Sequence, residues 1–584
     1  MIKENISKCI SLLEEQNIDI YIVPTADFHQ SEYVGEYFKG REFLTGFTGS
    51  AGTLLISKKE CCLWVDGRYY IQARQQVAGT GIKIMEAGMP NVPTIKEYLQ
   101  QYADCKLGFD GKVIAAKDVL DYNIDTIDYH HDLVDSIWSN RPMMSKNPGF
   151  LYDIKYCGES RTSKIERIRE KMKDCDHHII TSLEDIAWIF NIRGKDISCN
   201  PMLLSYAIID KDSSYLYVQN GTLETEAINT LKQENVIVKE YTAIYEDVKN
   251  LQGKILLDTS SVNYTIYKNI NSTCTLVDTV NPSQYFKAIK NDVEIKNTIN
   301  GHIKDGVAMT KFMYWLKTNI GKIEMDEISI SNTLENYRKQ QELFYDLSFN
   351  TICGYQENGA LMHYKATKEK YSKVYPKGLL LIDSGGQYLD ATTDITRTFA
   401  LGPISDQQRK DFTIVLKSML RLSNAKFIYG ATGVSLDILA RGVVYEYGLD
   451  YRCGTGHGVG HFLGVHEGPN GIRPNNRPGT IPLSVQEAGM ITTNEPGIYR
   501  EGEYGIRLEN ELLCVKDFEN EYGQFMKFET ITYCPLDIEA IDFTMMNQEE
   551  IEQLNMYHQD VYKKVSPFLT NEEKFWLHEF IKGL

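Results

Sequence analysis

Residues 378–402, "GLLLIDSGGQYLDATTDITRTFALG", place two aspartates within strongly apolar and β-branched sequence. Leu379–Ile382 predicts a buried strand that ends at Asp383, and Thr392–Leu401 predicts a second, alternating strand that contains Asp394. A carboxylate that follows a run of apolar residues must have a partner or displace the strand, because a lone buried charge is too costly. The alternative for Asp383 alone is a turn cap before the glycine pair that follows it.

A second pair of carboxylates, Glu495 and Glu509, lies in residues 488–515, "AGMITTNEPGIYREGEYGIRLENELLCV". Gly502 is midway between them, and "EGE" fits a three-residue hairpin loop. Pairing about Gly502 sets the two glutamates opposite each other, about 5 Å apart at Cβ, where like charges repel; Pro496 makes this register approximate. Two acids that face each other in apolar strands need a shared proton or a cation. The alternative, two unrelated surface carboxylates, fits the apolar neighbours poorly.

Residues 453–469, "CGTGHGVGHFLGVHEGP", add three histidines in a glycine-rich segment. His457 and His461 have the spacing of an HxxxH zinc pair, which needs a helix to bring the two rings together. The alternate glycines from Gly454 to Gly460 argue against a helix. We therefore expect His461 to be structural rather than a ligand.

The four carboxylates and the histidine segment together predict a metal site. Oxygen ligands with one imidazole suit hard or borderline divalent ions such as manganese better than copper or structural zinc. Four carboxylates carry more charge than one divalent ion neutralises. Two ions about 3.5–4 Å apart that share a bridging hydroxide fit the charge better.

Length and composition narrow the class of protein. A chain of 584 residues is too long for one hydrophobic core, and its length suggests about three or four domains. The formal net charge of −17 would repel phosphates, so we expect no nucleic-acid partner. We expect no membrane span, because no segment reaches ~18 consecutive apolar residues. The twelve cysteines include no CxxC pair and predict reduced thiols in a cytoplasmic protein.

Strand-like and helix-like segments alternate along the chain and predict an α/β (α+β) fold class. Apolar runs such as "DIYIVP" and "GTLLIS" lie between helices in residues 1–155, and "NRPMMSKNPGF" has the composition of a linker. A second α/β pattern begins with the helix "SRTSKIERIREKMKD", which Ser160 or Thr162 could cap. The segment that begins "NPSQYFKAIKND" starts a third unit, and two helices form the tail.

At these motifs the chain resembles a known family. "DSGGQYLDATTDITRTFALG", "GTGHGVGHFLGVHEGP", "NEPGIY" and "GIRLEN" are similar to the dinuclear-metal motifs of Xaa-Pro aminopeptidases, which are pita-bread-fold metallopeptidases. Upstream, "REFLTGFTGSAGTLLIS", "CLWVDGRYYIQA" and "TSLEDIAWIFNIRGKDISCNPMLLSYAII" resemble the long, three-domain form of aminopeptidase P. The resemblance covers about residues 20–560, and the motifs are specific in combination.

The resemblance implies an architecture and a ligand set. Two creatinase-like N-terminal domains would occupy residues 1–155 and 156–285, and a pita-bread catalytic domain with a C-terminal helical extension would occupy 286–584. The cofactor would be two divalent metal ions, with Mn²⁺ favoured over Zn²⁺ or Co²⁺. The family's metal ligands fall on Asp383, Asp394, His457, Glu495 and Glu509.

The resemblance also implies roles near the substrate. Glu495 would orient a water, take its proton and pass it to the leaving nitrogen. His466 or His363 would hydrogen-bond the carbonyl oxygen as its charge develops. The substrate-side residues are completed by Tyr499, which would line the prolyl pocket, and Arg507, which would orient a metal-binding carboxylate.

Two positions depart from the family pattern. Cys453 stands where the long form usually has a histidine near the substrate, and Ala391 replaces a glycine. The first change puts one substrate contact in doubt. The second is minor if the backbone there does not need a positive φ.

The implied function is release of the N-terminal residue from peptides with proline in the second position. The implied protein is a cytoplasmic homodimer with peptide substrates. The nearest alternative is a prolidase, an Xaa-Pro dipeptidase of the same fold. A non-catalytic pita-bread module that binds proteins is an alternative of another class, although it would not need five metal ligands.

Overall fold

Two six-stranded mixed sheets follow each other in the first half of the chain and share one topology. Their strand orders are β4-β3-β2-β1-β5-β6 and β12-β11-β10-β8-β13-β14. In both sheets the second strand of this order runs antiparallel to the third, and the third runs antiparallel to the fourth. The other three pairings in each sheet are parallel. The two sheets therefore form a structural repeat, although the sequence contains no short repeat that corresponds to it.

The strands and helices of this half have the following bounds. The first sheet contains β1 (Ile20–Pro24), β2 (Thr53–Ser57), β3 (Cys61–Val65), β4 (Lys83–Glu86), β5 (Leu107–Gly108) and β6 (Ile127–Asp128). The second contains β8 (His177–Ile180), β10 (Ser205–Asp210), β11 (Ser214–Val218), β12 (Val236–Glu240), β13 (Lys254–Leu257) and β14 (Thr275–Asp278). The longer helices are α1 (Ile2–Glu15), α8 (Arg161–Met172) and α10 (Thr225–Gln233), and Ser160 caps α8 through its side chain, as one of the two predicted caps.

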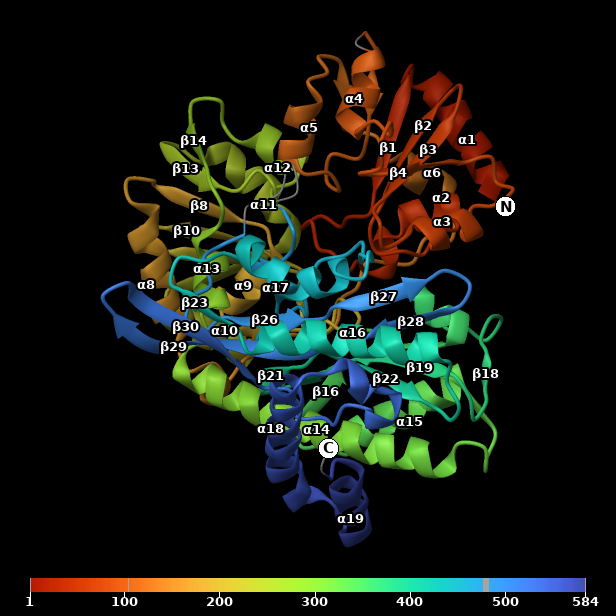
Figure 1. Ribbon diagram of the computed structural model, residues 1–584. Coiled ribbons are helices and arrows are strands. Elements are labelled where there is room, and N and C mark those ends of the chain that lie inside the picture. The colour runs from red at the N-terminus through yellow and green to blue at the C-terminus, as the bar shows by residue number, and fades with distance from the viewer. Residues whose placement is uncertain (1, 103, 476–482, 583–584) are drawn as a thin grey trace. The chain divides into compact units, whose positions relative to one another are not determined.

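The computed structural model describes residues 2–102, 104–475 and 483–582 (Figure 1). Its contacts divide the chain into two units. The N-terminal unit consists of Met1–Asp153 and Glu159–Gln284, and the C-terminal unit of Ile154–Gly158 and Tyr285–Leu584. The short helix α7 (Ile154–Cys157) belongs to the C-terminal unit because Asn297 donates to the carbonyls of Lys155 and Tyr156.

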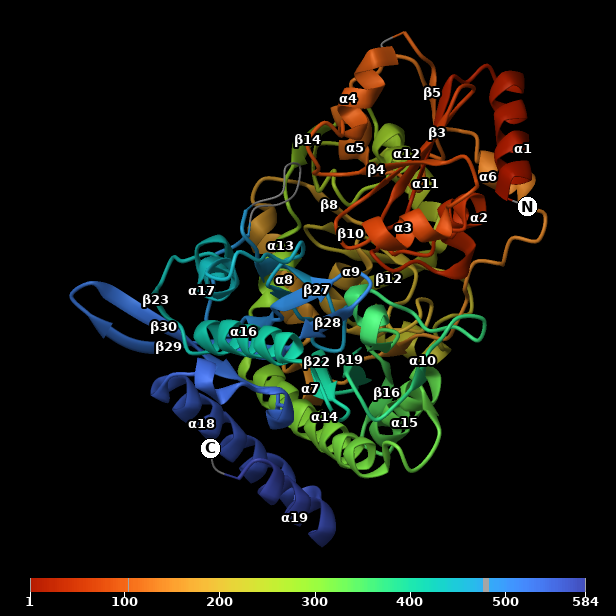
Figure 2. The same ribbon diagram turned by 45° about the vertical axis from the view of Figure 1, so that its right-hand side comes forward.

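The C-terminal unit is built on a three-stranded sheet and a six-stranded sheet. Their orders are β17-β19-β22 and β23-β30-β29-β26-β24-β25, and all recorded pairings in them are antiparallel. The strands are β17 (Ile352–Tyr355), β19 (Leu379–Ser384), β22 (Ile395–Ala400), β23 (Lys426–Ile428), β24 (Gly456–Gly458), β25 (Glu467–Ile472), β26 (Ile491–Asn494), β29 (Asn510–Asn520) and β30 (Gly523–Thr530). Figure 2 shows the β29–β30 hairpin extending beyond the other strands of its sheet.

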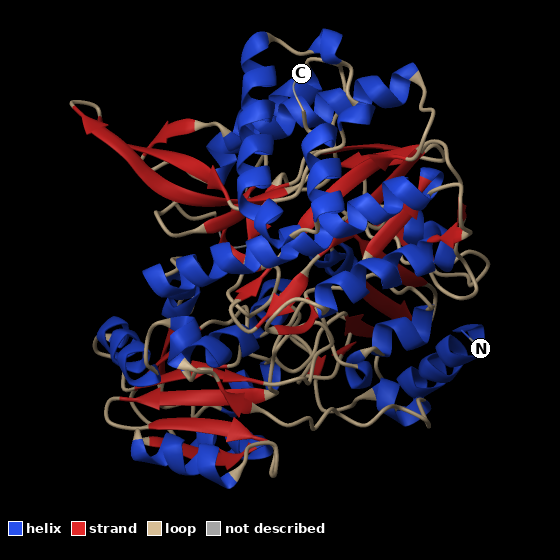
Figure 3. Ribbon diagram, turned by 90° about the horizontal axis from the view of Figure 1, so that it is seen from below, coloured by secondary structure: helices blue, strands red, loops and turns tan. Residues whose placement is uncertain are grey.

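Two pairs of helices enclose these sheets. They are α14 (Asp292–Asn319) with α15 (Glu327–Lys339), and α16 (Asp406–Ser423) with α17 (Gly433–Tyr445). Leu380 and Ile382 pack with apolar side chains of α14 and α15, whereas Leu379, on the other face of β19, packs with those of α16 and α17. Figures 1 and 3 show helices on both sides of the strands. Because side chains alternate along a strand, Asp383 is on the Leu379 face, away from α14.

The predicted hairpin about Gly502 is present. β27 (Gly497–Arg500) pairs with β28 (Tyr504–Arg507) about a three-residue loop, and Gly502 has a φ of 77°. The pairing of β26 with β29 continues the same register, with Asn494 opposite Asn510. Glu495 and Glu509 therefore stand opposite each other in the break between the two pairings.

One predicted strand is divided. The segment predicted as a single strand, Thr392–Leu401, forms β21 (Ala391–Thr392) and β22, and Asp394 lies in the gap between them. The N–H of Thr393 still donates to the carbonyl of Gly386 in β20 (Gly386–Tyr388) and continues the β20–β21 pairing. The N–H of Asp394 instead donates to the side chain of Glu511, so the ladder is broken at Asp394. Ala391 is absent from the residues with positive φ, so replacing glycine there causes no backbone strain.

The two helices expected in the tail are present. The tail forms α18 (Gln548–Val565) and α19 (Asn571–Phe580). All twelve cysteines are free thiols. Among residues 2–102, 104–475 and 483–582, no helix has the length and apolar character that a membrane crossing requires.

Candidate metal centre

The five predicted metal ligands come from strand ends and strand breaks of the C-terminal unit. Asp383 is near the end of β19, and Asp394 lies just before β22. His457 is the middle residue of β24, Glu495 lies between β26 and β27, and Glu509 lies between β28 and β29. Asp394, Glu495 and Glu509 thus lie outside the regular ladders, whereas Asp383 and His457 are paired within theirs.

The structure brings the ligand atoms together. One ligand atom each from Asp394, His457 and Glu509 lies within 4.8 Å of the others. His457 Nε2 is 3.4 Å from Asp394 Oδ2 and 3.5 Å from Glu495 Oε1. His457 Nδ1 is 2.9 Å from the carbonyl of Gly458 and must donate to it, which leaves Nε2 as the ring nitrogen that can bind a cation.

Two of the predicted ligands have a carboxylate oxygen with no hydrogen-bond partner among the described residues, as does Glu511 beside them. The two ligand oxygens are Asp383 Oδ1 and Asp394 Oδ1, and both side chains are buried. Buried carboxylate oxygens without a donor are unusual, and a cation is the partner that suits them. The donor set of oxygens and one imidazole therefore fits divalent metal ions.

The electrostatics point the same way. Burial raises the pKa of Asp394 well above its usual range, and the adjacent Asp383, Glu495 and Glu511 raise that pKa further. Burial likewise raises the pKa of Glu509, with Asp394, Glu495 and Asp383 adding to it. Without a cation these acids repel one another, because like charges in a shared buried site cannot all ionise.

Arg507 lies behind Asp383 and is itself buried. Its Nη2 is 2.5 Å from Asp383 Oδ2, and its Nη1 donates to the Tyr499 hydroxyl over 2.8 Å. Burial alone would lower the pKa of Arg507, but Tyr499, Asp383 and the nearby glutamates hold that pKa well above its usual range. The guanidinium therefore stays charged, and it fixes one oxygen of Asp383 while leaving the other free of protein donors.

The predicted histidines differ in how they lie relative to the site. The ring of His466 stands edge-on to that of His457, with centroids 4.3 Å apart and planes at 81°. His363 is half-buried in the segment after Ala360, and the preceding residue, Met362, accepts from Arg507 Nη2 over 3.4 Å. His461 is turned away: its Nδ1 contacts Thr298 Oγ1 at 2.9 Å and its Nε2 the carbonyl of Tyr156 at 3.0 Å, as expected for a structural histidine.

Tyr499 and Cys453 lie next to each other on the same side. Burial raises the pKa of Tyr499 more than the charge of Arg507 lowers it, and Cys453 is close enough to add to the rise. Both side chains pack against the core between the sheet and α16. The carbonyl of Cys453 accepts from Arg441 Nη2 over 3.0 Å, so its main chain is anchored whatever side chain it carries.

Sequence profiles of known families match four consecutive parts of the chain. The Creatinase/Prolidase N-terminal domain matches residues 5–123 and, in a second form, residues 140–294. Metallopeptidase family M24 matches residues 299–516, which contain all five ligand positions. The C-terminal region of peptidase_M24 matches residues 524–584.

Curated relatives match almost the whole chain. Aminopeptidase P2 of Arabidopsis thaliana is 36% identical over 630 residues, which cover 99% of this chain and 88% of that protein. Probable Xaa-Pro aminopeptidase P of Laccaria bicolor is 35% identical over 598 residues, which cover 98% of this chain and 91% of that protein. The chain belongs to the aminopeptidase P family of M24 metallopeptidases.

Solved structures agree with this membership in the aminopeptidase P family. X-prolyl aminopeptidase from Caenorhabditis elegans, described as a cytosolic enzyme with a di-nuclear active site, superposes with a TM-score of 0.94 at 30% identity and full coverage of both chains. A prolidase from Pyrococcus horikoshii, 24% identical with a TM-score of 0.50, covers 64% of this chain and shows the fold alone. The predicted fold class, two creatinase-like domains followed by a pita-bread domain, is confirmed.

Sequence reasoning missed several residues that hold the ligands. Glu511 is fully buried and accepts the N–H of Asp394, and Thr396 Oγ1 donates to Glu509 Oε2 over 2.7 Å. Arg397 is also fully buried, and its Nη1 donates to the carbonyl of Glu509 over 2.6 Å. A signal for Glu511 was available, because it is a further carboxylate within the apolar segment that follows Glu509.

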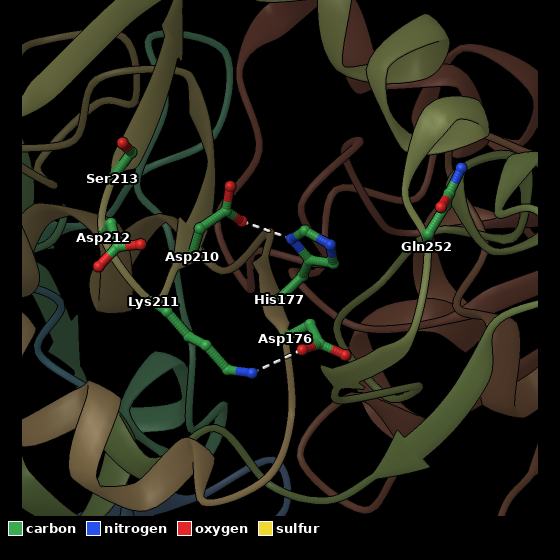
Figure 4. Close-up of a pocket in the computed structure, with 7 residues that line it drawn as sticks. All are labelled: Asp176, His177, Asp210, Lys211, Asp212, Ser213 and Gln252. Atoms are coloured by element: carbon green, nitrogen blue, oxygen red, sulfur yellow. Dashed lines mark hydrogen bonds and ion pairs between the residues drawn. The ribbon is translucent and has the colours of Figure 1, made fainter.

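A separate polar hollow of about 420 Å³ lies in the N-terminal unit and holds none of the predicted site residues (Figure 4). Four of its titratable groups form two pairs: His177 with Asp210 at 2.5 Å and Lys211 with Asp176 at 2.6 Å. We assign it no role.

Proposed function

We propose that this chain is a metal-dependent aminopeptidase that releases the N-terminal residue from peptides with proline in the second position. The proposal depends on the close approach of ligand atoms from Asp394, His457 and Glu509. They lie in a chain that Xaa-Pro aminopeptidase P relatives match over almost its whole length. The full-length match to curated Xaa-Pro aminopeptidase P relatives, and to the C. elegans structure at 30% identity, favours this reading over a prolidase.

The proposed cofactor is two divalent metal ions, with Mn²⁺ favoured. Asp383, Asp394, His457, Glu495 and Glu509 would hold them, in keeping with the di-nuclear site described for the C. elegans enzyme. When bound, such ions supply Lewis acidity for the scissile carbonyl and make a water more acidic. The free oxygens of Asp383 and Asp394 support this ligand set.

The protein's own residues would orient the substrate and move protons. The side chain of Glu495 is partly exposed, whereas Asp394 and Glu509 are buried, so Glu495 is the carboxylate placed to receive a proton from water and return it to the leaving nitrogen. His466 and His363 would donate to the carbonyl oxygen as negative charge develops on it. Arg507 would keep Asp383 in place through their 2.5 Å contact.

Selectivity for proline must depend on the shape of the pocket. The prolyl nitrogen in a peptide bond carries no hydrogen, so the site cannot recognise it through a donor at that atom. We propose that Tyr499 lines the prolyl pocket and that Cys453, beside it, is where substrate handling differs from that of relatives with a histidine there.

We further propose that the domains divide near residues 155 and 285, that the protein works in the cytosol and that it forms a homodimer. The cytosolic assignment follows the description of the C. elegans enzyme. The dimer rests on family resemblance alone, and sedimentation equilibrium of the full chain would reveal a monomer if it is wrong.

A peptide panel combined with metal analysis tests the proposed function. Protein reconstituted with Mn²⁺ should release arginine from Arg-Pro-Pro and should not cleave Arg-Ala-Ala at a comparable rate. Glu495→Ala should abolish release and weaken Mn²⁺ binding while leaving the circular dichroism spectrum unchanged, because a general base supplies about 10²–10⁴-fold in rate. Cleavage of dipeptides only would identify a prolidase, and absence of both metal and turnover would favour the binding module.

A further inference from the structure

The amide of Asp394 is held by a side chain instead of by a sheet. Asp394 lies in the two-residue gap between β21 and β22, and its N–H donates to Glu511 Oε1 over 2.8 Å. Its neighbour Thr393 donates to the carbonyl of Gly386 over 2.9 Å. The direction in which the Asp394 carboxylate leaves the backbone is therefore determined by a contact with Glu511.

Glu511 is itself firmly placed. It is the second residue of β29, where its Cα partner is Thr493 of β26, and its side chain is fully buried. Its own N–H donates to Thr532 Oγ1 over 2.8 Å, and its carbonyl accepts from Ile531 over 3.0 Å. A strand held on both sides gives the carboxylate little freedom to move away from Asp394.

The basic partner of Glu511 is His302 of α14, and this side chain is also buried. His302 Nδ1 is 2.9 Å from the carbonyl of Thr298 and must donate to it, since a carbonyl only accepts. Nε2 then faces Glu511 Oε1 at 3.0 Å, as an ion-pair contact without the direction of a good hydrogen bond. Burial alone would lower the pKa of His302, but the Glu511 carboxylate outweighs burial and raises that pKa.

Close packing leaves little room for this pair to rearrange. A Cβ at Gly301, the residue before His302, would lie 2.2 Å from the Cβ of Ala391 in β21. Helix α14 therefore approaches the strand next to Asp394 as closely as glycine permits. One turn further along α14, Asp305 accepts two hydrogen bonds from Arg338 of α15, at 2.7 and 3.0 Å. The buried His302 and Asp305 of α14 thus each have a partner of opposite charge.

From this geometry we propose that Glu511, held by His302, is a positioning residue for the metal site. It fixes the backbone of Asp394 so that the Asp394 carboxylate faces the other ligands. The inference rests on the proposed metal-dependent function, because it assigns Glu511 a purpose at that site. Glu511 acts through Asp394 and is not itself a ligand in this proposal.

The chain offers a matched control in Asp537. Asp537 is buried, accepts the N–H of Ala400 at the other end of β22 over 2.8 Å, and pairs with Lys317 of α14 at 2.5 Å. Glu511→Ala and Asp537→Ala each remove a buried hydrogen-bond acceptor at one end of β22. Each also removes the carboxylate that pairs with a basic side chain of α14. Only Glu511 is next to the metal ligands.

Two readouts on the metal-free full chain test the proposal. Calorimetric titration with Mn²⁺ should show a 10–100-fold higher Kd for Glu511→Ala, as is typical when a residue that supports a ligand is lost. Hydrogen exchange should be at least tenfold faster at Asp394. Asp537→Ala should keep the wild-type Kd within twofold and speed exchange at Ala400 instead. Glu511→Gln, which keeps an acceptor for the Asp394 amide, should stay within threefold of wild type.

Several outcomes would overturn the proposal. Wild-type Mn²⁺ affinity and exchange in Glu511→Ala would show that Asp394 does not depend on Glu511, and equal affinity losses in both alanine variants would show only general destabilisation. If Glu511→Ala does not fold, Glu511→Asp shortens the side chain by one methylene and carries the same expectations. If the wild type binds no Mn²⁺, the proposed function fails, while exchange at Asp394 still decides whether Glu511 positions it.

Discussion

At the scale of single residues, the site is a balance of buried charges. Asp383, Asp394 and Glu509 are buried close together, and Arg507 supplies one fixed positive charge through Asp383. One arginine cannot neutralise three acids, so the remaining charge calls for cations. The sequence indicated that these carboxylates need partners of positive charge, and the structure shows that Arg507 is one such partner, through Asp383.

Arg507→Lys tests this division of charge. Lysine keeps the positive charge but cannot contact Asp383, Tyr499 and Thr396 at once, as the guanidinium does. We expect kcat/KM on an Xaa-Pro peptide to fall about 10–100-fold and Mn²⁺ affinity to weaken, because Asp383 loses its orientation.

The control is Arg500→Lys in the same hairpin. Arg500 makes a two-point contact with Asp411, at 2.5 and 3.1 Å, away from the ligands. That variant should stay within threefold of wild type in both measurements. Equal effects of the two substitutions would mean that the hairpin, rather than the Asp383 contact, accounts for the loss.

At the scale of elements, strands and the breaks between them carry the proposed metal ligands, and a separate loop carries His363. That loop, residues 356–372, is attached to the buried carboxylate of Glu327 at the start of α15. Glu327 Oε1 accepts from Tyr355 N and Asn358 Nδ2, and Oε2 accepts from Tyr364 OH and Ser372 N, all at 2.7–2.9 Å. Metal binding and placement of His363 are thus supported by different elements.

Glu327→Gln should separate these two functions. The amide turns an NH₂ group toward donors that the carboxylate accepted, so the loop is disturbed while the ligand strands are not. We expect kcat/KM to fall about tenfold or more and the Kd for Mn²⁺ to change less than twofold, as judged by kinetics and calorimetry on the same preparation. Tyr364→Phe removes one of the four bonds and should give a smaller loss. A parallel fall in metal affinity would contradict the separation.

At the scale of the whole molecule, each unit buries a histidine in its neutral form. His558, on α18, accepts the N–H of Leu536 at Nε2, and burial lowers its pKa from 6.5 to about 3. His178, on β8, is likewise buried, with a pKa lowered to about 4. Both groups bind protons more readily in the unfolded chain, so both oppose folding as the pH falls below 6.5.

His558→Gln should reduce the acid sensitivity of the C-terminal unit. Because the folded-state pKa is depressed, the stability that neutral His558 contributes is present above pH 6.5 and is lost as the pH falls toward 3. The loss is about 1.4 kcal/mol for each pH unit. Glutamine can accept the same N–H and does not titrate. Urea unfolding at pH 8 measures how much the substitution itself changes the free energy of unfolding. Between pH 8 and pH 5.5 the free energy of unfolding of the wild type should fall by about 1.4 kcal/mol more than that of the variant. An equal loss in both proteins would contradict the assignment.

Much of the architecture was predictable because it depends on local patterns. Apolar runs predicted β19, and the spacing about Gly502 predicted the hairpin and its register across a proline. The prediction of one strand over Thr392–Leu401 was wrong because Asp394 bonds to Glu511, more than a hundred residues away. The common topology of the two N-terminal sheets was implied only by the family resemblance, since different sequences can satisfy the same strand order.

The sequence by itself determined the chemical types at the site and the segments that carry them. Carboxylates within apolar strands and a histidine between glycines are local facts, and their cost when buried predicts a cation. Only the tertiary structure decided which oxygens lack donors, that Arg507 holds Asp383, and that Glu511 and His302 hold Asp394. Those contacts join distant segments, and packing across the sheets and α14 determines them.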